Sequence, residues 1–209
     1  MESFSAEFQD DLTQLMRWRR DVRRFRADPV DEALLQQCLS AFSLAPSVGL
    51  SEPWRILLVQ SPQARAAALG NFQTANAAAL SGQSGDQARE YSKLKLSGMA
   101  DAPVQLAVFC DDTTVKGKGL GAATMPEMRR YSVVGAINHL WLAARARGLG
   151  VGWVSILDPR QLRRDLNAPE NWTLIAYLCI GWPQTTGTVP ELELLNWEAR
   201  QQRLPVETR

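Results

Sequence analysis

The stretch EMRRYSVVGAINHLWLAARARGLGVGWVSIL, residues 127–157, decides the fold. Apolar side chains recur in it every three or four residues, which predicts an amphipathic helix from about Glu127 to Arg147. The apolar face of this helix is formed by Val134, Ile137, Trp141 and Ala144. Arginines in the last turn and Gly148 beyond it are typical of a helix C-terminus. Residues 150–157 then predict a strand, so a long helix leads directly into a sheet.

Toward both ends of the chain, helix and strand patterns alternate without an internal repeat or a clear linker. Helices are predicted at about 5–18, at 31–42, over most of 62–99, and at 158–166, where Asp158 is the N-cap and Pro159 the first helical residue. Strands are predicted at 55–60, 104–109 and 173–181. This mixture indicates one α+β domain that spans residues 1–209.

Two segments lack a periodic pattern. Residues 111–126 form the longest aperiodic stretch, and a long ordered loop in a compact domain is often a lid over a site. Within it, Met125 and Pro126 are candidates to pack near a ligand. The C-terminal extension, about 184–209, has no strong pattern either, and we expect it to wrap around a partner subunit.

The charges of the chain are nearly balanced, with 23 basic and 22 acidic residues. This balance argues against a protein that coats nucleic acid or an anionic membrane, because both need a broad positive field. Six arginines nevertheless fall within the ten residues 17–26. Such a cluster either solvates a helix end or binds an anion such as phosphate, for which guanidinium groups are well suited.

Asp21 stands in the middle of these arginines, in the sequence RRDVRRF. Its carboxylate either forms structural ion pairs with its neighbours or serves as a base or hydrogen-bond acceptor in a reaction. Flanking cations favour the charged form of the side chain. The residues alone leave both roles open.

Other reactive residue types give little support for metal or hydrolase chemistry. Cys38, Cys110 and Cys179 are widely spaced in apolar stretches, which indicates reduced core residues of a cytoplasmic protein. His139, the only histidine, has no ligand at metal spacing and no nucleophile motif, so we expect a structural role. No secretory signal and no apolar run of membrane-spanning length is visible, which favours a cytoplasmic location.

Four segments resemble the FMN-dependent nitroreductase superfamily: RRDVRRF (19–25), APSVGLSEPW (45–54), TMPEM through ILDP (124–159) and YLCIGWP (177–183). More narrowly, they are similar to its flavin-fragmenting branch, the 5,6-dimethylbenzimidazole synthases. Ordinary nitroreductases usually carry Ser or Thr where Asp21 stands. The Asp, the TMPEM segment and GWVSI are therefore the narrower signals.

The resemblance implies a mixed central sheet flanked by helices, in an intertwined homodimer with two sites at the subunit interface. It also implies the residues that contact FMN: Arg19, Arg20, Asp21, Val22, Arg23, Ser47, Ser51, Gly152, Trp153, Val154, Ser155 and Arg200. Arg19, Arg20 and Arg23 would hold the phosphate and the pyrimidine edge. Ser47 would reach FMN across the interface. Asp21 and Ser155 would be the catalytic pair.

The reaction implied by the resemblance is the oxygen-dependent breakdown of reduced FMN to 5,6-dimethylbenzimidazole, the lower ligand of cobalamin. FMN is then the substrate together with molecular oxygen, and NAD(P)H, used directly or by a flavin reductase partner, would be the upstream reductant. Two alternatives remain. One is an NAD(P)H-dependent FMN nitroreductase or quinone reductase, and the other is a non-catalytic flavin-binding protein.

Overall fold

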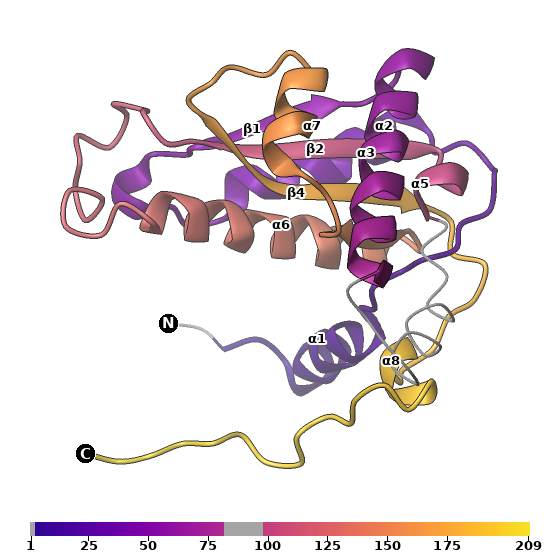
Figure 1. Cartoon of the computed structure of the whole chain (residues 1–209). Helices are drawn as coiled ribbons and strands as arrows, with labels where there is room; N and C mark the ends of the chain where they lie inside the picture. Colours follow the sequence, from indigo (N-terminus) through magenta and orange to yellow (C-terminus); the bar gives the residue numbers. More distant parts are fainter. Residues whose placement is uncertain (1–2, 82–97) are drawn as a thin grey trace.

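The computed structural model describes residues 3–81 and 98–209. Its centre is a four-stranded sheet with the strand order β1-β2-β4-β3 (Figure 1). The strands are β1 (Trp54–Leu58), β2 (Val104–Asp111), β3 (Gly150–Val154) and β4 (Trp172–Gly181). Each pair of neighbouring strands is antiparallel. The prediction of an α+β fold is confirmed.

The sheet differs in one respect from the mixed sheet that the resemblance implied. All four named strands pair antiparallel, and among the described residues a parallel component enters only through an isolated bridge between Asp21 and Val151. A second isolated bridge joins Phe25 to Pro183. The arginine-rich segment therefore lies along the outer edge of β3, where it supplements the sheet without forming a regular strand.

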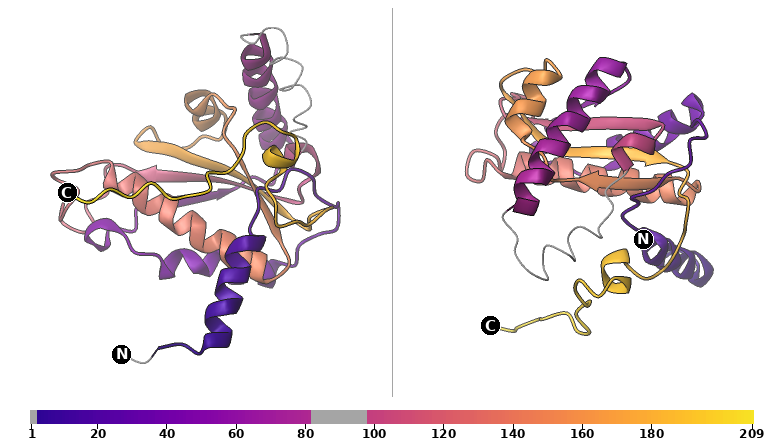
Figure 2. Two further views of the ribbon diagram at one scale, coloured as in Figure 1. Left: turned by 90° about the horizontal axis from the view of Figure 1, so that it is seen from below. Right: turned by 45° about the vertical axis from the view of Figure 1, so that its right-hand side comes forward.

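Helices cover both faces of the sheet and give the body three layers (Figures 1 and 2). On one face lies α6 (Met128–Ala146), together with α2 (Glu32–Leu39) and the 3-10 turns η1 (Ser40–Leu44) and η2 (Val48–Leu50). On the other lie α3 (Pro62–Ser81), α5 (Gly98–Asp101) and α7 (Pro159–Asp165). Because successive strand residues point to opposite faces, β2 supplies both cores. Leu106 and Val108 belong to the first core, and Ala107 and Phe109 to the second.

The predicted elements agree closely with those observed. The long helix begins and ends within one residue of its expected bounds, although Val134 is only half-buried. Asp158 caps α7 by accepting hydrogen bonds from the backbone N–H groups of Arg160 and Gln161, both at 2.9 Å. The helical prediction for 62–99 is confirmed up to Ser81 and again from Gly98, and residues 82–97 lie outside the described part of the chain.

Two terminal segments lie beneath the three-layer body (Figures 1 and 2). The first is α1 (Ala6–Trp18), and none of its thirteen residues, all of which the structure describes, is buried. Its exposed apolar side chains are Phe8, Leu12, Met16 and Trp18, preceded by Phe4. The second is the C-terminal region with the short helix α8 (Glu191–Leu194). Among the described residues, no helix is both long and apolar enough to cross a membrane.

Candidate functional site

The carboxylate of Asp21 is fixed at the edge of β3. The backbone N–H of Val22 donates to the carbonyl of Val151 at 3.0 Å, which aligns the segment with the strand. The backbone N–H of Trp153 donates to Asp21 Oδ1 at 2.9 Å. The side chain is 41% exposed, so its second oxygen remains accessible from a cavity. A carboxylate in this position is oriented by the sheet and open to a ligand.

Two glycines of β3 make this close approach possible. A Cβ atom at Gly152 would lie 2.2 Å from the carbonyl oxygen of Val22, and one at Gly150 would lie 2.6 Å from a Val22 methyl group. Any side chain at either position would push the arginine-rich segment off the strand. Gly150 and Gly152 are thus packing residues that let the arginine-rich segment approach β3.

Arg23 lies next to Asp21 and is mostly buried, with 13% of its side chain exposed. Its Nε is 3.3 Å from Asp21 Oδ2 and 3.8 Å from Glu191 Oε2. The ion pair with Asp21 is the structural alternative considered from the sequence. This ion pair does not bury the carboxylate. Oδ1 accepts from Trp153, Oδ2 pairs with Arg23, and the side chain is still 41% exposed.

Asp21, Arg23 and the end of β3 border a cavity of about 280 Å³. Of the residues predicted to bind FMN, those that line it are Asp21, Val22, Arg23, Gly152, Trp153, Val154 and Ser155. Its remaining wall is mainly apolar and comprises Phe72, Gly98, Ile156, Cys179, Leu192 and Trp197. An apolar wall facing a few convergent polar groups is the usual composition of a small-molecule site.

Cys179 is the member of this wall that sequence reasoning placed in the core alone. The thiol is buried, as predicted for all three cysteines, but it also lies beside the cavity because β4 pairs Cys179 with Gly152. Burial and the nearby charge of Asp21 raise the pKa of this thiol to about 12, so it stays neutral. The signal that could have revealed it was the alternation along YLCIG in the strand that neighbours β3.

A second cavity of about 370 Å³ shares Asp21, Val22 and Arg23 with the first and is also lined by Arg20 and Arg24. Arg20 lines it and donates through Nε to the carbonyl of Thr188 at 3.0 Å. Burial and the positive charges of Arg19 and Arg200 lower the pKa of Arg20, which places these three arginines within electrostatic reach of one another. The Arg19 guanidinium lies 4.8 Å above the ring of Trp141.

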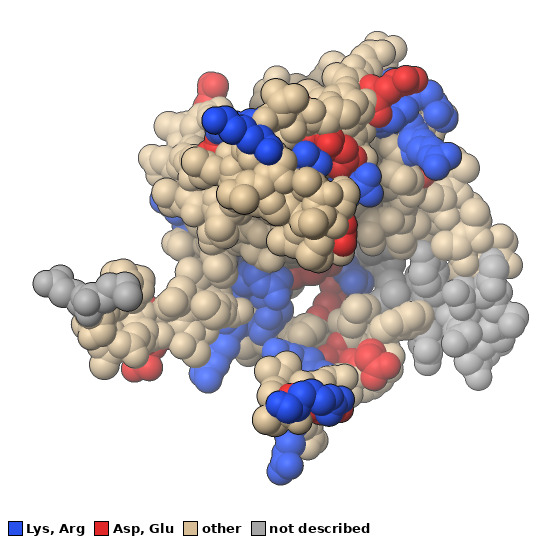
Figure 3. Space-filling model, turned by 90° about the vertical axis from the view of Figure 1, so that its left-hand side faces the viewer, with Lys and Arg blue, Asp and Glu red and all other residues tan. Residues whose placement is uncertain are grey.

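Basic side chains also gather at the margin of the hollow between the three-layer body and the terminal segments (Figure 3). Arg24 and Arg145 line the 370 Å³ cavity together with Arg20. Three arginines of the cluster, Arg20, Arg23 and Arg24, therefore line cavities, as expected for a site and not for a uniformly charged surface.

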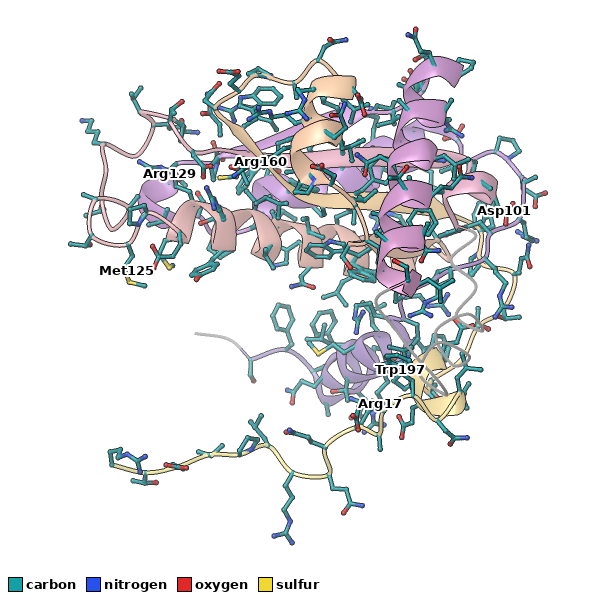
Figure 4. All side chains as sticks on the ribbon, in the orientation of Figure 1. Arg17, Asp101, Met125, Arg129, Arg160 and Trp197 are labelled. Carbon is teal, nitrogen blue, oxygen red and sulfur yellow. The ribbon has the colours of Figure 1, made fainter. Side chains whose placement is uncertain are left out.

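Four predicted site residues lie elsewhere in the chain: Ser47, Ser51, Met125 and Pro126. The Ser47 hydroxyl accepts a hydrogen bond from the backbone N–H of Glu52 at 3.1 Å. Ser51 is 2% exposed, and its hydroxyl has no hydrogen-bond partner among the described residues. Figure 4 places Met125 at the left-hand end of the molecule and Trp197 beneath its right-hand half. Within one chain, these residues do not approach the 280 Å³ cavity.

The loop at 111–126 packs against the loop that carries Ser47 and Ser51. A Cβ atom at Gly49 would lie 2.8 Å from the carbonyl oxygen of Leu120, and one at Gly121 would lie 2.9 Å from a methyl group of Val48. An ion pair between Lys116 and Glu52 joins the same two loops. They form one rigid unit, which we call the distal loop pair, at 47–52 and 111–126.

The base of the distal loop pair is anchored by two aspartates at the end of β2. Asp111 pairs with Arg55 at 2.9 Å, and Asp112 accepts two hydrogen bonds from Arg130 at 3.0 and 2.9 Å. Thr173 also donates to Asp112, at 2.5 Å. Burial alone would raise the pKa of Asp112, but the hydrogen bonds from Arg130 and Thr173 outweigh it and lower that pKa.

Sequence reasoning missed Phe72, Leu192 and Trp197 of the cavity wall, as well as the Glu191 carboxylate near Arg23. The C-terminal region carries no periodic pattern, and the resemblance implied a role at the site for Arg200 alone, so the contribution of residues 191–197 was not expected. His139, for which we expected a structural role, is half-buried within α6. Among the described residues there is no group of three or more His, Cys, Asp or Glu that could hold a metal ion.

Comparisons with known proteins agree with this geometry. Residues 16–182 match the model of the Nitroreductase family. The chain is 53% identical to a 5,6-dimethylbenzimidazole synthase of Rhodospirillum rubrum, with 95% of this chain and 94% of that protein covered. It is 48% identical to a protein of the same name from Rhodobacter capsulatus, with 98% of each covered. Among solved structures, iodotyrosine deiodinase bound to FMN and 3-iodo-L-tyrosine has a similar fold, with a TM-score of 0.73, 22% identity, and coverage of 95% of this chain and 97% of that one.

Proposed function

The chain belongs to the nitroreductase family and, within it, to the 5,6-dimethylbenzimidazole synthases, and we propose that it converts reduced FMN and molecular oxygen into 5,6-dimethylbenzimidazole, the lower ligand of cobalamin. The observation that carries this proposal is the carboxylate of Asp21, held by the backbone N–H of Trp153 at the mouth of a flavin-sized cavity. A flavin that only passes hydride to an acceptor needs no carboxylate there.

The residues around the 280 Å³ cavity fit a flavin ring. The isoalloxazine has an apolar dimethylbenzene edge and a polar pyrimidine edge. Phe72, Ile156 and Trp197 offer apolar surface to the first, and Arg23 offers a cation to the second. A fixed cation near the pyrimidine stabilises the negative charge of reduced flavin. Val22, Gly152 and Val154 complete the wall against which the ring would lie.

The phosphate of FMN carries about two negative charges and needs cations of its own. Arg20, which lines the second cavity, is one candidate, and Arg19 and Arg200 are two more, because the positive charges of both act on Arg20. A bound phosphate would relieve this repulsion between like charges. The arginine-rich segment would thus contribute to both ring binding and phosphate binding.

Asp21 and Ser155 are the residues that we assign to the chemistry. Fragmentation of the ring requires several proton transfers, and a positioned carboxylate can accept and return protons at one place. Asp21 keeps its orientation through Oδ1, while Oδ2 lies 3.3 Å from Nε of Arg23, and both residues line the cavity. Ser155 lies where β3 ends and lines the same cavity, so its hydroxyl can donate to the ring or to oxygen. FMN supplies the dimethylbenzene portion that leaves as product.

We further propose that the active unit is a homodimer in which the distal loop pair of one subunit completes the flavin site of the other. Met125 and Trp197 lie at different ends of the molecule (Figure 4), and Ser47, Ser51, Met125 and Pro126 are not among the residues that line the cavity of their own chain. The unburied apolar side of α1 and the exposed apolar residues of the C-terminal region offer surface for a second copy. Met125 and Pro126 would then close over the partner's flavin and exclude water.

The deciding experiment supplies the purified protein with FMN, a chemical reductant and air, and follows the products by mass spectrometry. Appearance of 5,6-dimethylbenzimidazole is the expected result. Intact FMN with rapid reduction of a nitroaromatic would identify an ordinary nitroreductase, and intact FMN without turnover a flavin-binding protein. Parallel reactions with NADH or NADPH, each with and without a separate flavin reductase, identify the source of electrons.

A further inference from the structure

We propose that residues 191–197, here called the α8 cover, determine which electron acceptors can reach the flavin. This inference rests on the proposed flavin site and concerns its specificity. The cavity wall contains two residues of this segment, Leu192 and Trp197. Both come from the C-terminal region of the same chain, whereas the distal loop pair lies at the other end of the molecule (Figure 4).

The geometry of the α8 cover is fixed by its own backbone. The N–H of Trp197 donates to the carbonyl of Leu192 at 2.8 Å, and the N–H of Asn196 donates to the carbonyl of Glu193 at 3.0 Å. Asn196 has a φ of 56°, the left-handed conformation that ends a helix in this motif. The two hydrogen bonds fold the chain back, so that Trp197 and Leu192 approach one another as parts of a single apolar wall.

Ion pairs hold this wall in place over the cavity. Glu191 Oε1 accepts from Arg24 at 2.5 Å, and Glu191 Oε2 lies 3.8 Å from Nε of Arg23. Arg23 also contacts Asp21, so one guanidinium links the cover to the proposed catalytic carboxylate. Arg23, Arg24 and Glu191 thus join two segments that are far apart in the sequence. Arg24 and Glu191 are separated by 167 residues.

The position of the cover has a direct consequence for specificity. Molecular oxygen is diatomic and needs little free space beside the ring, whereas a nitroaromatic or quinone must stack on it. The indole of Trp197 and the side chain of Leu192 form one wall of the 280 Å³ cavity, so with the flavin ring in this cavity they would stand where an aromatic acceptor has to stack. The cover therefore admits oxygen and excludes aromatic acceptors, which keeps electrons on the productive route.

The test compares two acceptors in single-turnover oxidation of enzyme-bound FMN that has been reduced under nitrogen by light, with EDTA as the electron donor. With 4-nitrobenzoate, two electrons and two protons pass from reduced FMN to the nitro group, giving the nitroso compound, water and oxidised FMN. Trp197→Ala should increase this rate about tenfold, the size of effect expected when a steric wall is removed. The rate with oxygen is measured on the same FMN-loaded variant, and the ratio of the nitrobenzoate rate to the oxygen rate should rise, because oxygen already has access to the ring.

Three further variants complete the design. Trp197→Phe keeps an aromatic wall and should behave like the unsubstituted protein. Leu204→Ala, at an exposed position that lines neither cavity, is the matched control. Leu192→Ala shortens the other side chain of the same wall. If Trp197→Ala fails to retain FMN, the nitrobenzoate and oxygen rates of Leu192→Ala are compared in its place.

Equal nitrobenzoate rates in the unsubstituted protein and in the wall variants would overturn the proposal. A parallel rise with both acceptors would also overturn it, because the cover would then limit general access and not select by size. These rates need only bound reduced FMN. Failure to form 5,6-dimethylbenzimidazole would thus count against the proposed function alone, and failure to bind FMN would count against the shared flavin site.

Discussion

At the scale of single residues, the two oxygens of Asp21 have separable roles. Oδ1 accepts from the backbone of Trp153, and Oδ2 lies near Arg23. Asp21→Asn keeps an oxygen that can accept from Trp153 and removes the negative charge. We expect FMN binding to persist and formation of 5,6-dimethylbenzimidazole to fall by about 10²–10⁴-fold, the usual contribution of a general acid or base.

The measurement for Asp21→Asn pairs an FMN titration by fluorescence with product analysis by mass spectrometry. Asp28→Asn is a suitable control, since Asp28 forms an exposed ion pair with Arg26 at 3.3 Å outside both cavities. Loss of FMN binding in Asp21→Asn, with Asp28→Asn unaffected, would show that Asp21 mainly supports the structure.

Two glycine substitutions test how tightly the arginine-rich segment lies on β3. Gly152→Ala places a methyl group against the Val22 carbonyl, and we expect a loss of about 1–3 kcal/mol in the free energy of unfolding. Gly70→Ala in α3 meets no atom within 4 Å, so it should stabilise the protein by about 0.5–1 kcal/mol. Urea unfolding of both variants measures the two changes, and a neutral Gly152→Ala would contradict the observed packing.

At the scale of elements, the end of β2 holds the distal loop pair through Asp112 and Arg130. Asp112→Asn removes the charge but keeps the size, and we expect it to lower the free energy of unfolding by about 1–2 kcal/mol at neutral pH. Asp165→Asn, which changes an exposed carboxylate that accepts from Gln161, is the control.

The pH dependence of the Asp112→Asn effect has a definite sign. The folded state lowers the pKa of Asp112 below its ordinary value of 3.8. The carboxylate therefore contributes stability above pH 3.8, and this contribution is lost as the pH falls through the lowered folded pKa. Urea unfolding at a series of pH values should show the difference between the two proteins shrinking below pH 3.8. A difference that is constant down to pH 2 would argue against the ion pair.

Most elements could be predicted from the sequence because their signals are local. The apolar stripe of α6, the cap at Asp158 and the apolar runs of β2 and β4 are each contained in a short window. The predicted site residues Gly152–Ser155 also meet Asp21, Val22 and Arg23 of the arginine-rich segment at one cavity, whereas Arg19 and Arg20 do not line it. Trp197 was missed because its position depends on a backbone motif and on ion pairs with Arg23 and Arg24, which no local pattern encodes.

At the scale of the whole molecule, the proposed site residues form two separate groups, one at the 280 Å³ cavity and one in the distal loop pair. If each active site combines the cavity of one subunit with the distal loop pair of the other, two inactive variants should restore activity to one another in a mixed dimer. Asp21→Asn damages the cavity, and Ser47→Asp damages the distal loop pair by placing a negative charge where FMN is expected. The new carboxylate can still accept from Glu52, so the loop should keep its shape. Neither variant should be active alone.

Unfolding and refolding the two variants together should restore roughly a quarter of the active sites, because half of the dimers are mixed and each has one intact site. Product formation by the mixture is the readout, and light scattering should give twice the chain mass of 23.2 kDa. If the mixture contains verified mixed dimers and is still inactive, each site must be formed by the cavity and the distal loop pair of the same subunit.

The bridge between Asp21 and β3 has a consequence for how the protein is made. Trp153, which holds the Asp21 carboxylate, follows it by 132 residues, and Glu191, which pairs with Arg24, follows that arginine by 167. On the ribosome, the arginine-rich segment emerges early and must wait for most of the polypeptide before its docking surface exists. Closing such distant contacts is slow. Nascent chains should therefore acquire flavin affinity only near the end of translation, after the helical layers have already condensed.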